Sequence, residues 1–386
     1  MQVSLKEQTR KEVIEALHQQ GYKVNENSFF LNDTNRETKR KVHSLAKIER
    51  VDQRKEFIKR KANLIKQTLL DGDRLEVEKI NPKLIKVEAN SQWETLFRWW
   101  NLVWWSLPYE RAYGRQIRYV IWDQYHKAPI GLIGLQSPIL SWSVRDKYLG
   151  IFKESRDYWI NQSLSAQRLG ALPPYNHVLG GKLVAYLMAS YVVRNHFKAK
   201  YAHVETVIQR RKLPANLLFI TTTGAYGKSS IYNRLKFENE HVAKFIGYSH
   251  GSGSFHIPNT LFDNLIKFLE NEGYNVRRGY GSGPSRKLRL INQSLKLLGF
   301  NDGSSHGVQR AVYLFPFVKN LQEVIQSRAR PRWHHRSINK LTEHWKNRWA
   351  LPRVQKDQSF KNFSGDMFIA ETLSNLGSLA KAFREK

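Results

Sequence analysis

Two neighbouring apolar segments constrain the fold of this chain more than any other feature of its sequence. Residues 117–123 (IRYVIWD) and 129–135 (PIGLIGL) are rich in β-branched and other apolar side chains, and a short polar loop separates them. Runs of this length, bounded by polar residues, are typical of β-strands. We therefore expect two consecutive strands here.

The segments that follow alternate between helical and strand character. Residues 146–168 are expected to be mainly helical, and residues 179–193 (LGGKLVAYLMASYVV) predict a strongly apolar helix. Residues 215–223 (ANLLFITTT) predict a buried strand, followed by a Gly-rich turn and a second short helix. This order predicts an α/β or α+β fold with a mixed central sheet flanked by helices.

Basic segments flank this core. Residues 36–66 hold twelve Lys or Arg against four Asp or Glu, and their apolar side chains recur at roughly helical intervals. This pattern predicts a long basic amphipathic helix or a broken pair of helices. The composition divides the chain into a basic helical N-terminal region (1–72), a core (73–327) and a basic, aromatic C-terminal extension (328–386).

The overall charge points to a polyanionic partner. The chain has 63 Lys and Arg against 33 Asp and Glu, which gives a net charge of +30. It contains no cysteine, which excludes a disulfide scaffold and thiolate zinc sites. No secretory signal or apolar run of about 20 residues is present. We expect a cytoplasmic protein with no membrane association, no cofactor and no metal.

The stretch GAYGKSS (224–230) ends like a phosphate-binding P-loop but fails its spacing. A P-loop requires four residues between its glycines, and position 222 is Thr222 rather than glycine. A strand that leads through a glycine turn into a helix still predicts an anion site, and an ordinary capped turn is the alternative. The predicted anion-binding residues are Thr222, Thr223, Gly224, Gly227, Lys228, Ser229 and Ser230, together with Gly180, Gly181 and Lys182.

Signals for catalysis are weaker. No zinc-protease or nucleophile-elbow motif is present, and we interpret Asp123, Asp146 and Asp157 as structural carboxylates. The histidines of the loop GYSHGSGSFHIP are either acid–base groups or loop residues bonded to the backbone, and the second interpretation is favoured. The candidate catalytic residues are Lys228, Tyr232, Arg234, His250 and His256.

Basic residues interleaved with aromatic ones predict nucleic-acid contacts in two places. The first is the Gly-rich basic loop and helix start after residue 276, and the second is the C-terminal extension. The predicted contacts are Arg277, Arg278, Arg286, Lys287, Arg289, Arg328, Arg330, Arg332, Trp333, Arg336, Trp345, Arg348 and Trp349. For the five tryptophans between residues 93 and 105, burial in a core is favoured over base stacking.

Seven stretches occur in the order seen in one family. They are YGRQIRYVIWD, IGLIGL, ALPPYNHVLGGKLVAYL, LLFITTTGAYGKSSIYNRL, IGYSHGSGSFHIP, GSGPSRKLRLI and HGVQRAVYL. Over roughly residues 60–330 the chain thus resembles the family of DruA, the shared component of the Druantia anti-phage defence system. The resemblance implies a prokaryotic defence protein with other defence subunits as partners, including a helicase-like protein. A transposition-associated role stays open, because related proteins also occur near mobile elements.

The core also resembles an acyl-CoA N-acyltransferase. In that fold a Q/R-x-x-G-x-G/A turn binds the coenzyme pyrophosphate. Here His177 begins the window, Gly180 fits, and Lys182 replaces the second small residue, which puts cofactor binding in doubt while the fold survives.

Three functions follow from these observations. The favoured one is a nucleic-acid-binding component, with DNA as the expected ligand, of a Druantia-type defence complex. The alternatives are an enzyme with an acyltransferase-like or nucleotide-binding core, acting on nucleic acid or a small donor, and a scaffold for acidic proteins. The strandedness of the nucleic acid, RNA as a ligand and homo-oligomer formation are left open.

Overall fold

The computed structural model describes residues 4–31, 33, 35–105, 112–206, 209–254, 256–277 and 286–382. Its centre is a seven-stranded sheet with the order β10-β11-β7-β6-β5-β4-β3. Only β6 and β7 pair in parallel, and all other neighbours are antiparallel. The strands are β3 (Pro82–Lys86), β4 (Gln116–Asp123), β5 (Ala128–Gln136), β6 (Ser163–Ala171), β7 (Phe219–Thr223), β10 (Lys244–Tyr248) and β11 (Ala311–Pro316). The mixed central sheet predicted from the sequence is confirmed.

One central strand was not predicted. Residues 146–168 were expected to be mainly helical, but only α5 (Ser143–Leu149) and α6 (Arg156–Ile160) are helices, and β6 follows them. The prediction was wrong because SLSAQRLGA carries small and polar residues in place of the β-branched ones that mark most strands. Neighbouring structure requires these small residues: a Cβ at Gly170 would lie 3.0 Å from the ring of Trp105.

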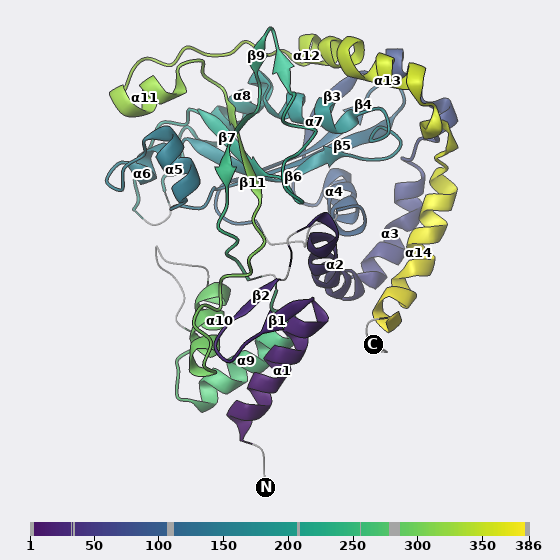
Figure 1. The fold of residues 1–386 in the computed structure, drawn as a ribbon. Coiled ribbons are helices and arrows are strands. Elements are labelled where there is room, and N and C mark those ends of the chain that lie inside the picture. The colour runs from purple at the N-terminus through teal and green to yellow at the C-terminus, as the bar shows by residue number, and fades with distance from the viewer. Residues whose placement is uncertain are drawn as a thin grey trace.

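Helices cover both faces of the sheet (Figure 1). On one face α7 (Gly180–Met188), α8 (Tyr191–Tyr201) and α12 (Ile338–Trp345) bury apolar side chains against the strands. On the other face α4 (Gln92–Val103), α3 (Lys55–Lys66) and α14 (Gly365–Ala382) form a separate apolar cluster that includes Trp99 and Trp100. Burial of these two tryptophans confirms the packing role favoured for them. The basic N-terminal segment forms a broken pair of helices, α2 (Arg36–Asp52) and α3.

A second apolar core lies below the sheet in Figure 1. It joins α1 (Leu5–Gln19), β1 (Tyr22–Val24) and β2 (Phe29–Leu31) to α9 (Asn259–Asn271) and α10 (Arg286–Leu297), which are inserted between β10 and β11. We call these elements and the loops between them the small lobe. Ser4 and Glu7, which have the spacing of a capping box in the sequence, form one at the start of α1.

The C-terminal segment runs along the edge of the molecule from α11 (Leu321–Ser327) through α12, α13 (Leu351–Lys356) and α14 (Figure 1). It is anchored by specific contacts. The indole of Trp345 donates a 3.1 Å hydrogen bond to the carbonyl of Leu179, and the amide of Gly72 donates a 2.8 Å bond to the carbonyl of Phe363. A short hairpin, β8 (Lys236–Phe237) and β9 (Glu240–His241), completes the fold. Among the described residues, no helix is both long and apolar enough to cross a membrane.

Candidate functional site

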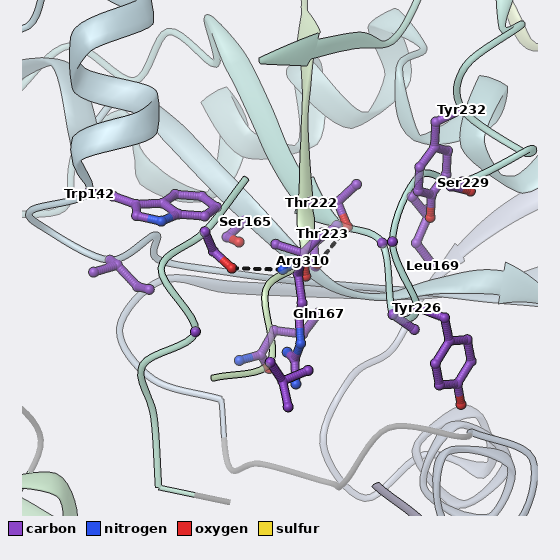
Figure 2. A pocket seen from close by; sticks show the side chains of 18 of the residues that line it. Trp142, Ser165, Gln167, Leu169, Thr222, Thr223, Tyr226, Ser229, Tyr232 and Arg310 are labelled. Atoms are coloured by element: carbon purple, nitrogen blue, oxygen red, sulfur yellow. Dashed lines mark hydrogen bonds between the residues drawn. The ribbon is translucent and has the colours of Figure 1, made fainter. Parts of the chain in front are cut away.

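A large cavity opens where two parallel strands part. β6 and β7 are paired from Ser163 to Ala166 and from Phe219 to Thr222, after which β7 ends while β6 continues to Ala171. Open parallel sheets bind ligands at such places, because no neighbouring strand fills the space. The resulting cavity has a volume of about 1080 Å³. The sheet, the first turn of α2, the loop before α5 and the small lobe all contribute to its walls, and Figure 2 shows side chains that line it.

Gln167 owes its position in the cavity to a β-bulge. In the β5–β6 ladder Gly134 pairs with Arg168 and Leu135 pairs with Ala166, so Gln167 has no partner residue on β5. A bulge re-aims the side chain of the extra residue, and bulges are enriched beside functional sites. Gln167 lines the cavity, and its side-chain amide makes no hydrogen bond within the described part of the chain. Figure 2 shows Ser165 and Gln167 between Trp142 on one side and Tyr226 on the other.

Buried charges hold the loop that carries Trp142. The guanidinium of Arg145, fully buried, donates to the carbonyls of Ile139 (2.6 Å) and Leu140 (2.8 Å). Its neighbour Asp146 accepts from the amide of Trp142 at 3.1 Å and pairs with Arg145. Asp146 is therefore a structural carboxylate, as predicted, and it fixes the rim of the cavity.

The cavity is lined by cations without carboxylates. Its charged lining residues within the described part of the chain are Arg36, Arg168, Lys228 and Arg310, and no Asp or Glu is among them. Arg36 lies over the ring of Tyr226, with the guanidinium 6.0 Å from the ring centre. A concave surface with charge of one sign focuses the electrostatic potential and attracts anions.

Two buried histidines border these cations. His43 and His306 are 0% and 4% exposed, and burial, reinforced by the nearby Arg310 guanidinium, lowers the pKa of His43 to about 3. Burial likewise lowers the pKa of His306 to about 2. Both rings are therefore neutral near pH 7. His306 accepts a 3.1 Å hydrogen bond from the amide of Val308 at the cavity wall.

The predicted anion-binding stretch lines the cavity, but it is not the start of a helix. Residues 222–230 all contribute to the wall. The prediction of a helix after Gly227 is wrong. The chain makes only turns up to residue 234, and β8 begins at Lys236, so too few residues remain for a helix. The amide of Ser229 donates instead to the hydroxyl of Tyr313 at 2.8 Å. An anion here would meet turn amides and Lys228 rather than a helix dipole.

The second part of the predicted anion site is occupied by the protein's own backbone. Lys182 is 5% exposed, and its ammonium group donates to the carbonyls of Ser230 (2.9 Å) and Ile231 (3.0 Å). Burial lowers its pKa to about 8. A Cβ at Gly180 would lie 2.5 Å from the carbonyl of Tyr175, and one at Gly181 would lie 3.0 Å from the Ile231 side chain. These glycines therefore allow close packing at the start of α7, and Lys182 fastens α7 to the cavity wall.

The candidate catalytic residues do not form one cluster. Lys228 and His250 line the cavity, and the imidazole Nε2 of His250 lies 3.1 Å from the hydroxyl of Ser143. Tyr232 is buried at the wall, and burial raises its pKa. Arg234 is exposed outside the cavity. His256 is buried in the small lobe, where its ring bonds to the carbonyl of Gly303 at 2.9 Å.

Two other carboxylates have structural partners. Asp123 is fully buried, and it contacts His126 at 2.7 Å and the hydroxyl of Tyr175 at 2.9 Å. The other ring nitrogen of His126 accepts from the amide of Glu76 at 3.0 Å, so this Asp–His pair has no nitrogen left for a substrate. Asp157 forms an ion pair with Arg211.

Two basic residues at the start of α10 bond within the small lobe, with Arg286 donating to the carbonyl of Val276 at 2.9 Å and Lys287 to Asn259 at 3.0 Å, whereas the basic residues of the C-terminal extension are dispersed. Leu288 in the first turn of α10 lines the cavity, and its neighbours include the predicted contacts Arg286, Lys287 and Arg289. Arg277 is exposed, and Arg278 lies outside the described residues. In the extension, exposed side chains are Arg328, Arg330, Arg332 and Arg348, while Trp333 and Trp349 are half-buried.

Two predicted contacts in the extension lie in the interior. Trp345 is fully buried, and Arg336 is 2% exposed and donates to the carbonyl of Pro316 at 2.9 Å. Their burial assigns both side chains to packing within the protein, with no surface left for a nucleic acid.

Sequence reasoning did not identify Arg36, Trp142, Ser165, Gln167 and Arg310 as site residues. Ser165 and Gln167 lie on β6, which was interpreted as helical. The strand-like alternation that places both residues on one face was therefore not recognised. Arg36 and Arg310 are two of 63 basic residues, and nothing in the local pattern separates them from surface charges. The one available signal was the family-like segment HGVQRAVYL, which contains Arg310.

Comparison with known proteins gives one consistent result. The family described as "Druantia protein DruA" matches residues 33–327. A protein of that description from Escherichia coli (strain UMEA 4076-1) is 35% identical over 327 residues, which cover 83% of this chain and 81% of the relative. No solved structure matches the chain at a significant level.

Proposed function

The chain belongs to the Druantia protein DruA family and is therefore a component of an anti-phage defence system, and we propose a function for it. We propose that it binds nucleic acid in the cavity between the sheet and the small lobe. DNA is the expected ligand, since the infecting or replicating phage genome is the polyanion that a defence protein meets. Other subunits of the system are its expected partners.

The observation that supports this proposal is the one-sided charge of the cavity. Four cationic residues line it, of which Arg36 and Lys228 are exposed, and no Asp or Glu does so within the described residues. Lys and Arg that contact phosphates release bound counterions, which makes the affinity strongly dependent on salt. Exposed Arg40, whose guanidinium lies 5.6 Å from the ring centre of Tyr226, extends the same basic surface along α2. The net charge of +30 supports long-range attraction of the polyanion.

Equilibrium binding across a salt series tests the proposal. Fluorescence anisotropy would compare single-stranded DNA, duplex DNA and RNA with the wild type and the Arg36→Ala/Lys228→Ala variant. The matched control is Lys198→Ala/Lys356→Ala, which removes two exposed charges on α8 and α13, away from the cavity. We expect the cavity variant to lose affinity at least tenfold more than the control. Equal losses, or no binding at low salt, would contradict the proposal.

A second candidate function is chemistry on the bound nucleic acid, and the Ser143–His250 contact favours it. A hydroxyl within 3.1 Å of an imidazole at a cavity rim is the geometry in which a base activates a nucleophile. Ser143→Ala and His250→Ala variants would be compared for phage protection and for nucleic-acid affinity. Lost protection with unchanged affinity supports chemistry, whereas full protection by both variants excludes this pair as catalytic.

A further inference from the structure

We propose that the cavity holds a single unpaired nucleobase of the bound strand, with the amide of Gln167 reading its edge and Trp142 stacking on its face. The inference rests on the proposed function and goes beyond it, because it specifies single-stranded nucleic acid and assigns two residues to base recognition. A base within a duplex cannot reach a site of this kind unless it leaves its stack.

The interior of the cavity offers hydrogen-bonding groups that the protein does not use itself. The side chains of Ser165, Gln167 and Thr223 line it, and none of them makes a hydrogen bond within the described part of the chain. Polar side chains that line a cavity and have no hydrogen-bond partner in the protein are expected to bind a ligand. A carboxamide presents a donor and an acceptor side by side, which matches the edge of a nucleobase.

The position of Gln167 argues for a dedicated role. The bulge in β6 interrupts a central ladder at this one residue, and the side chain emerges where β6 and β7 separate. A bulge costs regular hydrogen bonding, and its frequent use is to re-aim a side chain. Two neighbours of Gln167 on β6, Ala166 and Arg168, keep their partners on β5. The amide is thus placed in the cavity by the backbone and not by chance packing.

Trp142 supplies the aromatic surface that a base needs. Trp142 is half-buried and lines the cavity wall. Asp146 and Arg145 fix the loop that carries it. Stacking on an exposed aromatic side chain is the main way in which proteins hold unpaired bases.

The charges lie where the sugar–phosphate backbone would pass. Arg36 and Lys228 are exposed lining residues, and they come from the first turn of α2 and from the loop after β7. Ser165, Gln167 and Thr223, by contrast, belong to the strands of the sheet. Neutral hydrogen-bonding groups on the sheet and exposed cations on the surrounding segments separate base recognition from phosphate binding, and Arg168 and Arg310 add positive charge to the cavity wall. The cavity volume of about 1080 Å³ is large enough for a nucleotide and part of its neighbours.

The test uses the full chain and two kinds of synthetic strand. One is a ten-residue deoxyribose phosphate strand without bases, and the other carries a single adenine, cytosine, guanine or thymine at its centre. Because the first strand offers phosphates only, it measures the charge contribution, and the ratio of the two affinities measures the contribution of the base. We expect at least one base to raise the affinity of the wild type about tenfold, in the range for one stacked base.

Two variants test which residues cause the gain in affinity that the base provides. Gln167→Met, which keeps the size and removes the amide, and Trp142→Ala are each expected to reduce the gain to less than threefold while binding the strand without bases as tightly as the wild type does. Retained binding of that strand shows that the variants are folded. If no base raises the affinity, or if both variants keep the full gain, the inference is overturned while the proposed function stands. If neither strand binds at low salt, the proposed function itself fails.

Discussion

The hydroxyl of Thr222 donates a 3.0 Å hydrogen bond to the carbonyl of Ala166, and these two residues form the last pair in the parallel β6–β7 ladder. Beyond this pair the strands part, and the cavity begins. The bond therefore closes the ladder at the point where its regular hydrogen bonding stops, and both residues are largely buried.

Replacing Thr222 with valine is expected to lower the free energy of unfolding by about 1–2 kcal/mol, because a buried carbonyl loses its donor. Thr223→Val is the matched control, since its hydroxyl makes no hydrogen bond within the described residues and a change of less than about 0.5 kcal/mol is expected. Urea unfolding monitored by circular dichroism measures both. Equal effects of the two substitutions would show that the Thr222 bond does not stabilise the strand pair.

Lys228→Ala is expected to weaken binding to single-stranded DNA uniformly across sequences. It should reduce the slope of log affinity against log salt by about 0.7, the value for one phosphate contact on a single strand. Arg234→Ala removes an equal charge that is exposed but does not line the cavity, and its slope should stay unchanged. Binding titrations with single-stranded DNA at four salt concentrations measure this slope. Identical slopes for Lys228→Ala and the wild type would remove Lys228 from the interface.

Acid is expected to destabilise the protein through its buried histidines. The pKa values of His43, His256 and His306 in the folded state are about 3, 4 and 2, below the ordinary value of 6.5, because burial disfavours the charged ring. The unfolded state therefore binds more protons below pH 6.5, and stability present above this pH is lost as the pH falls toward the folded values. Each histidine contributes about 1.4 kcal/mol per pH unit between roughly pH 6 and pH 4.

Urea unfolding at pH 7, 6 and 5 measures this loss. A His256→Gln variant should show a shallower dependence on pH, because one buried titrating group is removed. Ser294→Ala serves as the control, since it alters another buried polar residue of the small lobe that does not titrate, and it should keep the pH dependence of the wild type. A wild-type stability that is constant from pH 7 to pH 5 would show that these rings are accessible to protons in the folded protein.

Gly72→Ala is expected to release the C-terminal segment from the core. A Cβ at this position would lie 1.7 Å from the carbonyl of Phe360, so the turn that carries Phe360 must move, at a cost of about 1–3 kcal/mol. The displaced turn precedes α14, whose first residue Gly365 bonds through its amide to Asp71 at 2.8 Å. Limited trypsin digestion should then cut near Lys361 much faster than in the wild type. A Gln358→Ala variant in the same exposed turn should digest like the wild type, and an unchanged pattern in Gly72→Ala would contradict the anchoring role.

Local patterns were sufficient for the elements that carry strong periodicity. The paired strands at residues 117–123 and 129–135, the capping box at Ser4 and the buried tryptophans of α4 were all predictable. Helical structure was also predictable for residues 179–193, although the structure divides this stretch between α7 and the start of α8. In each case a few adjacent residues determine the preference, because the apolar spacing matches one regular backbone geometry. The family was also identifiable, since its stretches recur in a fixed order.

The sequence by itself therefore determined the class of fold, the basic character and the family. Apart from the stretch 222–230, which the sequence predicted, tertiary structure decided the site. Its residues Arg36, Trp142, Gln167, Lys228 and Arg310 come from five separate segments, which meet because β6 and β7 part beside the small lobe. Which strands pair, where a ladder stops and which residue bulges depend on contacts between residues far apart in the chain. No local pattern records those contacts, so β6 and the reason for Gln167 became visible only with the folded sheet.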